Sequence, residues 1–103
     1  MSQNLKVKLT VLKAPKPEEV FEKMPLTLKY SGSCPDHKVG QEFIVDSESK
    51  PDGFCDLAWN ALWPYIMTIR HGGDFSEFYE EPGKALGCCP DAVRPVAFLV
   101  ERI

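Results

Sequence analysis

The sequence predicts an α+β fold in which a small, mostly antiparallel sheet of about four strands packs against one long helix. Several short segments alternate apolar and polar residues, which is the period of a strand with one buried face, and only the middle of the chain shows helical spacing. The 103 residues suit one domain, residues 1–103, and a content of 44% apolar residues is enough to form a core.

The first half of the chain predicts two strands around a short helix. The first strand is indicated by apolar residues at every second position: Leu5, Val7, Leu9 and Val11. Pro17 before two acidic residues is typical of a helix start, and Pro25 ends a helix of about two turns. Residues 26–30 suit an edge strand or an extended loop, residues 31–39 a loop that contains Cys34, and residues 41–46 a second strand.

The principal helix is predicted to begin near Asp52, as its N-cap, and to end at Gly72 and Gly73. Pro64 should kink or divide this helix near Asn60, because proline lacks the backbone donor. Its apolar residues recur at helical spacing: Cys55, Ala58, Leu62, Tyr65, Ile66 and Ile69. Two tryptophans, Trp59 and Trp63, widen this apolar face beyond what one sheet normally covers. We therefore expect an oligomer or a larger protein partner.

The last part of the chain predicts a C-terminal β-hairpin. Residues 85–89 and 94–102 form its strands, with Pro90 at the second position of the turn. Val96, Phe98 and Val100 should form its buried face. Arg94 and Arg102 are an even number of residues apart and should face one side of the last strand, where they bind an anion or pair with Glu42 and Glu101.

The net charge, the first residues and the absence of a long apolar run argue against several classes of protein. The net charge is −3 and the basic residues are scattered, so we expect no nucleic-acid partner. Residues 1–8 lack the apolar stretch of a signal peptide, and no run of residues is apolar enough to span a bilayer. These features predict a cytoplasmic protein without a membrane partner. In that reducing compartment, cysteines are expected to be free, bound to metal or redox-active.

Four cysteines are the main candidates for function, and they permit a metal site. Zinc or an iron–sulfur cluster needs four donors, usually with a closely spaced pair, and Cys34 with His37 gives a Cys-x-x-His spacing. Neighbouring strand residues point to opposite faces, so only one of Cys88 and Cys89 should join Cys55 unless the turn twists the other inward. Three cysteines with His37 then fit as well as four cysteines. The candidate metal ligands are Cys34, His37, Cys55, Cys88 and Cys89.

The same thiols permit redox chemistry without a metal. Cys55 near a helix N-terminus would lie at the positive end of the helix dipole, which favours a thiolate, and its partner would be Cys34 or one of the hairpin cysteines. His71 is not its base, because 16 residues of helix separate the two by about 24 Å. The alternative is an interaction or oligomerisation module whose cysteines only pack, since cysteines are often small buried apolar residues. Whether the protein is an enzyme stays open.

Several short motifs carry a resemblance that covers most of the chain. These are Gly53-Phe54-Cys55, Arg70-His71-Gly72-Gly73, Cys88-Cys89-Pro90-Asp91, Arg94-Pro95-Val96 and Glu101-Arg102-Ile103. The match also includes Cys34-Pro35 and Gly40-Gln41-Glu42-Phe43. Together these motifs resemble an uncharacterised family of small cysteine-containing proteins found largely in anaerobic bacteria and archaea. The resemblance implies that thiols at positions 34, 55, 88 and 89 belong to the family pattern. Ala92 departs from that pattern, which resembles Cys-Cys-Pro-Asp-Gly, and alanine would be less comfortable than glycine if the turn needs a positive φ.

Overall fold

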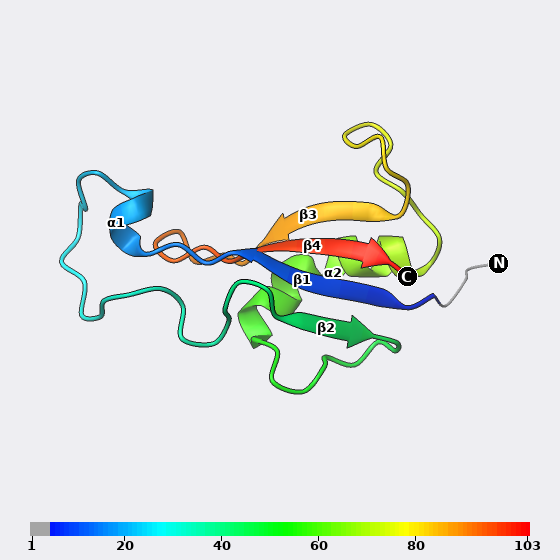
Figure 1. The fold of residues 1–103 in the computed structure, drawn as a ribbon, viewed down its shortest axis with the longest axis horizontal. Coiled ribbons are helices and arrows are strands. Elements are labelled where there is room, and N and C mark those ends of the chain that lie inside the picture. The colour runs from blue at the N-terminus through cyan, green and yellow to red at the C-terminus, as the bar shows by residue number, and fades with distance from the viewer. Residues whose placement is uncertain (1–4) are drawn as a thin grey trace.

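A computed structural model describes residues 5–103 and arranges four strands and two helices as Figure 1 shows. The elements in chain order are β1 (Val7–Lys13), α1 (Pro17–Val20), β2 (Glu42–Val45), α2 (Asp56–Arg70), β3 (Lys84–Cys88) and β4 (Ala97–Arg102). All neighbouring strands are antiparallel, in the order β2-β1-β4-β3. The α+β class, the four-stranded antiparallel sheet and the C-terminal hairpin are confirmed. Within residues 5–103, no helix is long and apolar enough to cross a membrane.

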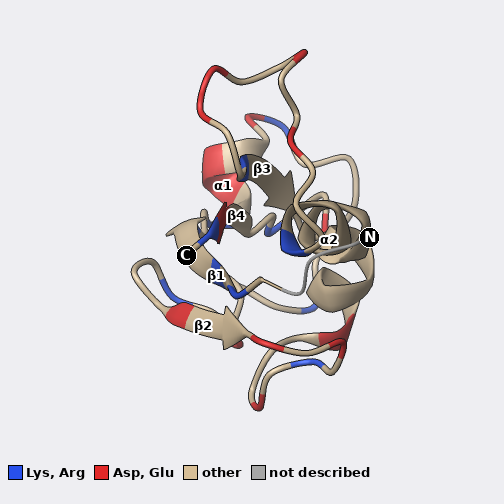
Figure 2. Cartoon of the chain, turned by 90° about the vertical axis from the view of Figure 1, so that its right-hand side faces the viewer, with Lys and Arg blue, Asp and Glu red and all other residues tan. Residues whose placement is uncertain are grey.

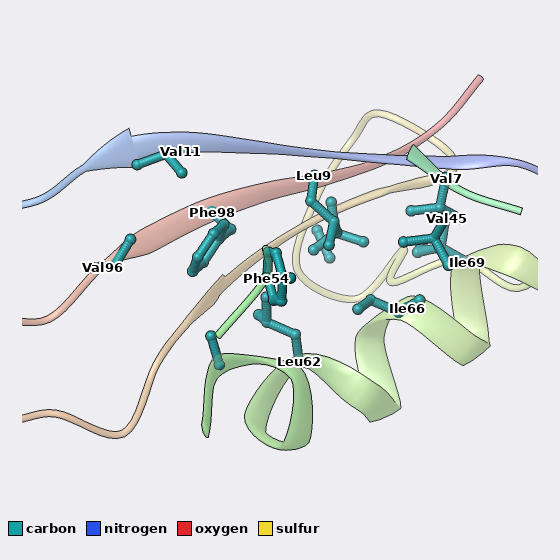
Figure 3. Close-up of a cluster of buried hydrophobic side chains, with 13 residues drawn as sticks. Val7, Leu9, Val11, Val45, Phe54, Leu62, Ile66, Ile69, Val96 and Phe98 are labelled. Carbon is teal, nitrogen blue, oxygen red and sulfur yellow. The ribbon is translucent and has the colours of Figure 1, made fainter. Parts of the chain in front are cut away.

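The alternating pattern of the sequence determines which face of the sheet is buried. On β1, Val7, Leu9 and Val11 are at most 1% exposed, and Leu9 lies opposite Phe43 on one neighbour and Val100 on the other. These odd-numbered side chains of β1 all point to the face that α2 covers, as Figure 3 shows. The even-numbered side chains therefore point to the other face, which we call the open face.

Helix α2 lies across the covered face of the sheet (Figure 2). Its side chains at helical spacing, Leu62, Ile66 and Ile69, are fully buried against the strands (Figure 3). Burial of that apolar stripe holds the helix on the sheet. Trp59 packs partly on this core and contacts Trp63 edge-on, with ring centroids 5.6 Å apart.

The closest approach between helix and sheet occurs at Gly87 on β3. A Cβ atom there would overlap the Cδ2 atom of Leu62, and it would also meet the ring of Tyr65 at 3.5 Å. Glycine at this position therefore allows α2 to lie directly on the hairpin.

Arg102 joins the end of α2 to the last strand. Its Nη1 donates hydrogen bonds to the carbonyl oxygens of Ile69 and Gly73, both at 2.9 Å, and its Nη2 lies 3.0 Å from the Asp74 carboxylate. These bonds tie the backbone at the end of α2 and just after it to the last strand. The expectation that Arg102 faces Glu42 and Glu101 is therefore wrong, because its side chain lies on the covered face.

Three local expectations differ from the structure. The first helix is a single turn of four residues, since Phe21 is already extended. Strand β4 begins at Ala97 rather than Arg94, and helix α2 begins at Asp56 with Cys55 as its N-cap, not at Asp52. For two other expectations the structure excludes one of the alternatives: residues 26–30 form no strand, and α2 continues through Pro64 without dividing. The end of α2 agrees with the expected stop, since His71 is its C-cap and Gly72 follows at φ 90°.

Replacing Gly87 with alanine tests the close packing of α2 on β3. Because the new methyl group would overlap the fully buried side chain of Leu62, Gly87→Ala should lower the free energy of unfolding by about 1–3 kcal/mol. Urea denaturation measures this change. Lys84→Ala, on the open face of the same strand, is the matched control and should cost less than about 1 kcal/mol. Equal stability of Gly87→Ala and the wild type would show that the helix does not lie as close as described.

Candidate thiol site

Three of the four cysteines line one pocket of about 120 Å³. Cys34 comes from the long connection between α1 and β2, Cys55 is the N-cap of α2, and Cys89 directly follows β3. All three are partly exposed free thiols. We call this cavity the thiol pocket; its other lining residues are Pro35, Asp36, Leu57, Pro90, Asp91 and Arg94.

Cys88 does not line the thiol pocket. It is the last residue of β3, where Gly87 faces the helix, so the side chain of Cys88 lies on the open face and is exposed. The sequence left open which of the two adjacent cysteines joins the others, and the structure selects Cys89.

The side chain of Cys89 is oriented by two hydrogen bonds to Val96. Its backbone N–H donates to the carbonyl of Val96 at 3.0 Å, and the N–H of Val96 donates back to the Cys89 sulfur at 3.2 Å. Cys89 is thus held through both its backbone and its sulfur, and Val96 itself is buried in the core.

Asp91 shapes the turn that follows Cys89. Its Oδ1 accepts hydrogen bonds from the backbone N–H groups of Val93 (2.9 Å) and Arg94 (3.0 Å). Partial burial acts to raise the pKa of Asp91, but the backbone hydrogen bonds from Arg94 and Val93 and the Arg94 guanidinium outweigh it and lower the pKa. No residue other than glycine has a positive φ within residues 5–103, so this turn accepts Ala92 without strain.

Arg94 ties this turn to the loop that carries Cys34. Its Nε donates to Asp91 at 3.3 Å, and its guanidinium carbon lies 4.0 Å from the ring centroid of Tyr30. The cation–π contact joins two segments that each supply a cysteine. The expected position of Arg94 on the last strand is wrong, and its proposed pairing with Glu42 or Glu101 is replaced by Asp91 and Tyr30.

His37 lies beneath the pocket rather than in its wall. The ring is 1% exposed, and its Nε2 accepts a hydrogen bond from the backbone N–H of Cys55 at 3.3 Å. A backbone N–H can only donate, so Nε2 is unprotonated in this arrangement and Nδ1 is the nitrogen that faces Gln41 Oε1, also at 3.3 Å. His37 therefore positions the start of α2 and the thiol of Cys55 with it.

The predicted metal ligands are separated by this arrangement. Cys34, Cys55 and Cys89 meet at the thiol pocket, His37 bonds to backbone below it, and Cys88 lies on the other face. Within the described part of the chain, no three residues among His, Cys, Asp and Glu are arranged to hold a metal ion.

Cys89 affects the pKa of Cys88, although only Cys89 lines the pocket. Partial burial raises the pKa of the Cys88 thiol, and the negative charge of Cys89 and a hydrogen bond between the two side chains raise it further. At neutral pH, Cys88 is thus mostly a protonated thiol even though it is the most accessible of the four.

Some residues of the site were not anticipated from the sequence. The sequence pattern places Asp91 in a turn and Arg94 in a strand, and nothing in it marks Leu57, which is 62% exposed and lines the pocket. The spacing of Asp91 and Arg94 by three residues is the one signal that indicates a side chain closing its own turn.

Comparison with models of protein families, with curated proteins and with solved structures finds no match for this chain.

Replacing His37 with phenylalanine tests its contribution to the site. His37→Phe keeps an aromatic ring among the neighbouring rings but leaves the Cys55 N–H without an acceptor, so the free energy of unfolding should fall by about 1–3 kcal/mol. The rate at which iodoacetamide modifies Cys55 should rise, because the start of α2 is no longer fixed. His37→Ala, which also loses ring volume, should be less stable still. A His37→Phe protein with wild-type stability would contradict this role.

The coupling of Cys88 to Cys89 predicts how alkylation depends on pH. Because the Cys88 pKa is raised, the rate of its alkylation should reach half of its maximum at a higher pH than for an ordinary cysteine. Cys89→Ser removes the neighbouring charge and should shift that midpoint downward, although burial keeps it above the ordinary value. Mass spectrometry of dilute protein at a series of pH values measures both midpoints. Cys34→Ser is the control and should leave the Cys88 midpoint in place.

Proposed function

We propose that this chain is a thiol–disulfide accessory protein that acts through Cys34, Cys55 and Cys89. The observation that carries the proposal is the convergence of these three thiols, from three segments far apart in sequence, on one pocket. A structural role for each cysteine separately would not require them to meet. We retain the resemblance to small cysteine-containing proteins of anaerobes, and a cytoplasmic location, as parts of this proposal.

Cys55 is the proposed attacking thiol. It is the N-cap of α2 and its side chain makes no capping hydrogen bond, so the sulfur is free to react. Negative charge that develops on this sulfur would lie at the positive end of the helix dipole. Lys50 donates through its Nζ to the carbonyl of Phe54 at 2.7 Å and pairs with Asp56 at 2.6 Å, so it orders the same helix start without adding a net positive charge.

The reaction proceeds by two exchange steps. The Cys55 thiolate attacks a disulfide of a partner, forms a mixed disulfide and releases the first partner thiolate. A second pocket thiol, from Cys34 or Cys89, then attacks the Cys55 sulfur and releases the second partner thiolate. The chain gains one disulfide, and the partner disulfide receives two electrons and two protons. The reverse sequence reduces the pocket and oxidises the partner.

Metal binding is the second candidate, and the same three thiols support it. Soft metals accept sites built from thiolates, so a zinc or iron–sulfur site at Cys34, Cys55 and Cys89 stays a hypothesis. Thiol exchange ranks first because it needs only two sulfurs at a time, whereas zinc or an iron–sulfur cluster needs four donors and three cysteines line the pocket. An interaction module with structural cysteines is the remaining alternative, and self-association is compatible with either function.

Disulfide mapping distinguishes these functions. Reduced protein treated with oxidised glutathione should form one internal disulfide between two of the three pocket cysteines, identified by peptide mass spectrometry without reduction. Cys55→Ser should abolish rapid oxidation, whereas Cys88→Ser, the neighbouring thiol outside the pocket, should oxidise as the wild type does. Oxidation that requires Cys88, or no internal disulfide at all, would contradict the proposal. Near-stoichiometric metal in protein purified without oxygen would favour the second candidate.

A further inference from the structure

The open face of the sheet is uncovered. Helix α2 packs on the opposite face, and no described segment passes in front of the four strands in Figure 1, which views the sheet from this side. Apolar side chains remain exposed at both edges of this face, where Ile44 on β2 is 46% exposed and Leu86 on β3 is 50% exposed. A sheet face that combines exposed apolar residues with ordered charges is a candidate interface.

Four charged side chains cross the open face and form what we call the charged row. In the order β2, β1, β4, β3 they are Glu42, Lys8, Glu101 and Lys84, so their signs alternate across the sheet. Lys8 lies 3.6 Å from Glu42 and 3.5 Å from Glu101, and Lys84 lies 3.4 Å from Glu101. Cross-strand pairing places Lys8, Glu101 and Lys84 directly in register, which fixes the alternation.

The charged row is complementary to itself when it is reversed. Read from β2 to β3 the signs are minus, plus, minus, plus, and read from β3 to β2 every position has the opposite sign. A two-fold axis that runs parallel to the strands, between β1 and β4, reverses the row. It places Glu42 over Lys84 of a second copy, and Lys8 over Glu101. An axis across the strands would instead place each charge over a like charge.

We propose that the open face binds a second copy of this chain, related by that two-fold axis. The two sheets then stack as an aligned sandwich with a helix on each outer side. Self-complementarity identifies the occupant, because an unrelated partner has no reason to match the reversed row. Leu86 and Ile44 supply apolar area at the margins. The interface uses none of the residues that line the thiol pocket, so it goes beyond the proposed function and does not depend on it.

Charge reversal tests both the face and its orientation. Sedimentation equilibrium should show a dimer of the wild-type chain at concentrations up to about 1 mM and low ionic strength. Glu101→Lys places like charges at position 8 of one copy and position 101 of the other, twice in each dimer, and should weaken dimerisation by at least about tenfold. Lys8→Glu should do the same. Glu48→Lys, an equal charge change on the exposed loop between β2 and α2, should leave it unchanged.

Mixing the two single variants provides the decisive result. In the mixed dimer, the positive charge introduced at position 101 faces the negative charge introduced at position 8, and the native Lys8 faces the native Glu101, so the dimer should form again. The double variant Lys8→Glu/Glu101→Lys should also dimerise with itself. A monomeric wild type, or single variants that dimerise as well as the wild type, would overturn the proposal. Failure of the mixture to dimerise, with both variants folded by circular dichroism, would also overturn it.

Discussion

The buried ring of His37 is the contact on which the arrangement of the thiol pocket depends. It brings a long, irregular connection into the core, where the ring meets Phe54 at 5.0 Å, Phe43 of β2 at 5.5 Å and Phe98 of β4 at 5.6 Å, measured between centroids. These aromatic contacts fix the ring, and its Nε2 then fixes the backbone of Cys55. Because His37 follows Cys34 by three residues, the same contact also brings Cys34 to the pocket. A polar ring is tolerated in this apolar setting because both of its nitrogens have partners.

The start of α2 shows how long-range contacts replace a local cap. A helix normally begins with a side chain that accepts a hydrogen bond from its first turn, but Cys55 makes no such bond. Lys50 instead holds the approach to the helix, with its Nζ 2.6 Å from the carboxylate of Asp56 and bonded to the carbonyl of Phe54. Asp56 in the first turn balances that lysine and suits the helix dipole. The sulfur of the cysteine at the N-cap therefore makes no capping hydrogen bond, which is compatible with its proposed role as the attacking thiol.

The regular elements could be predicted from the sequence because each has one buried face. The apolar–polar alternation that includes Leu9 and Phe98 follows from this burial, and so does the helical spacing that includes Leu62. The start of α2 could not be predicted, because its N-terminus is set by His37, 18 residues earlier in the chain, and local capping rules pointed to Asp52 instead. The Cys-x-x-His spacing of Cys34 and His37 indicated metal ligands, yet nothing in that spacing reveals that the histidine nitrogen meets a backbone N–H. The convergence of Cys34, Cys55 and Cys89 likewise depends on loop packing that no local pattern encodes.

The division of two adjacent cysteines between opposite sides of the sheet has a chemical consequence. Cys89 lines the thiol pocket and Cys88 lies on the open face, but the charge of Cys89 still contributes to the raised pKa of Cys88. A sulfur that enters a disulfide no longer carries negative charge. If Cys89 is oxidised in the pocket, the charge that opposes ionisation of Cys88 disappears and the pKa of Cys88 falls, so the fraction of thiolate on the open face rises. On the proposed function, a disulfide at Cys89 would therefore remove one of the causes that raise the pKa of Cys88, while burial would still raise it.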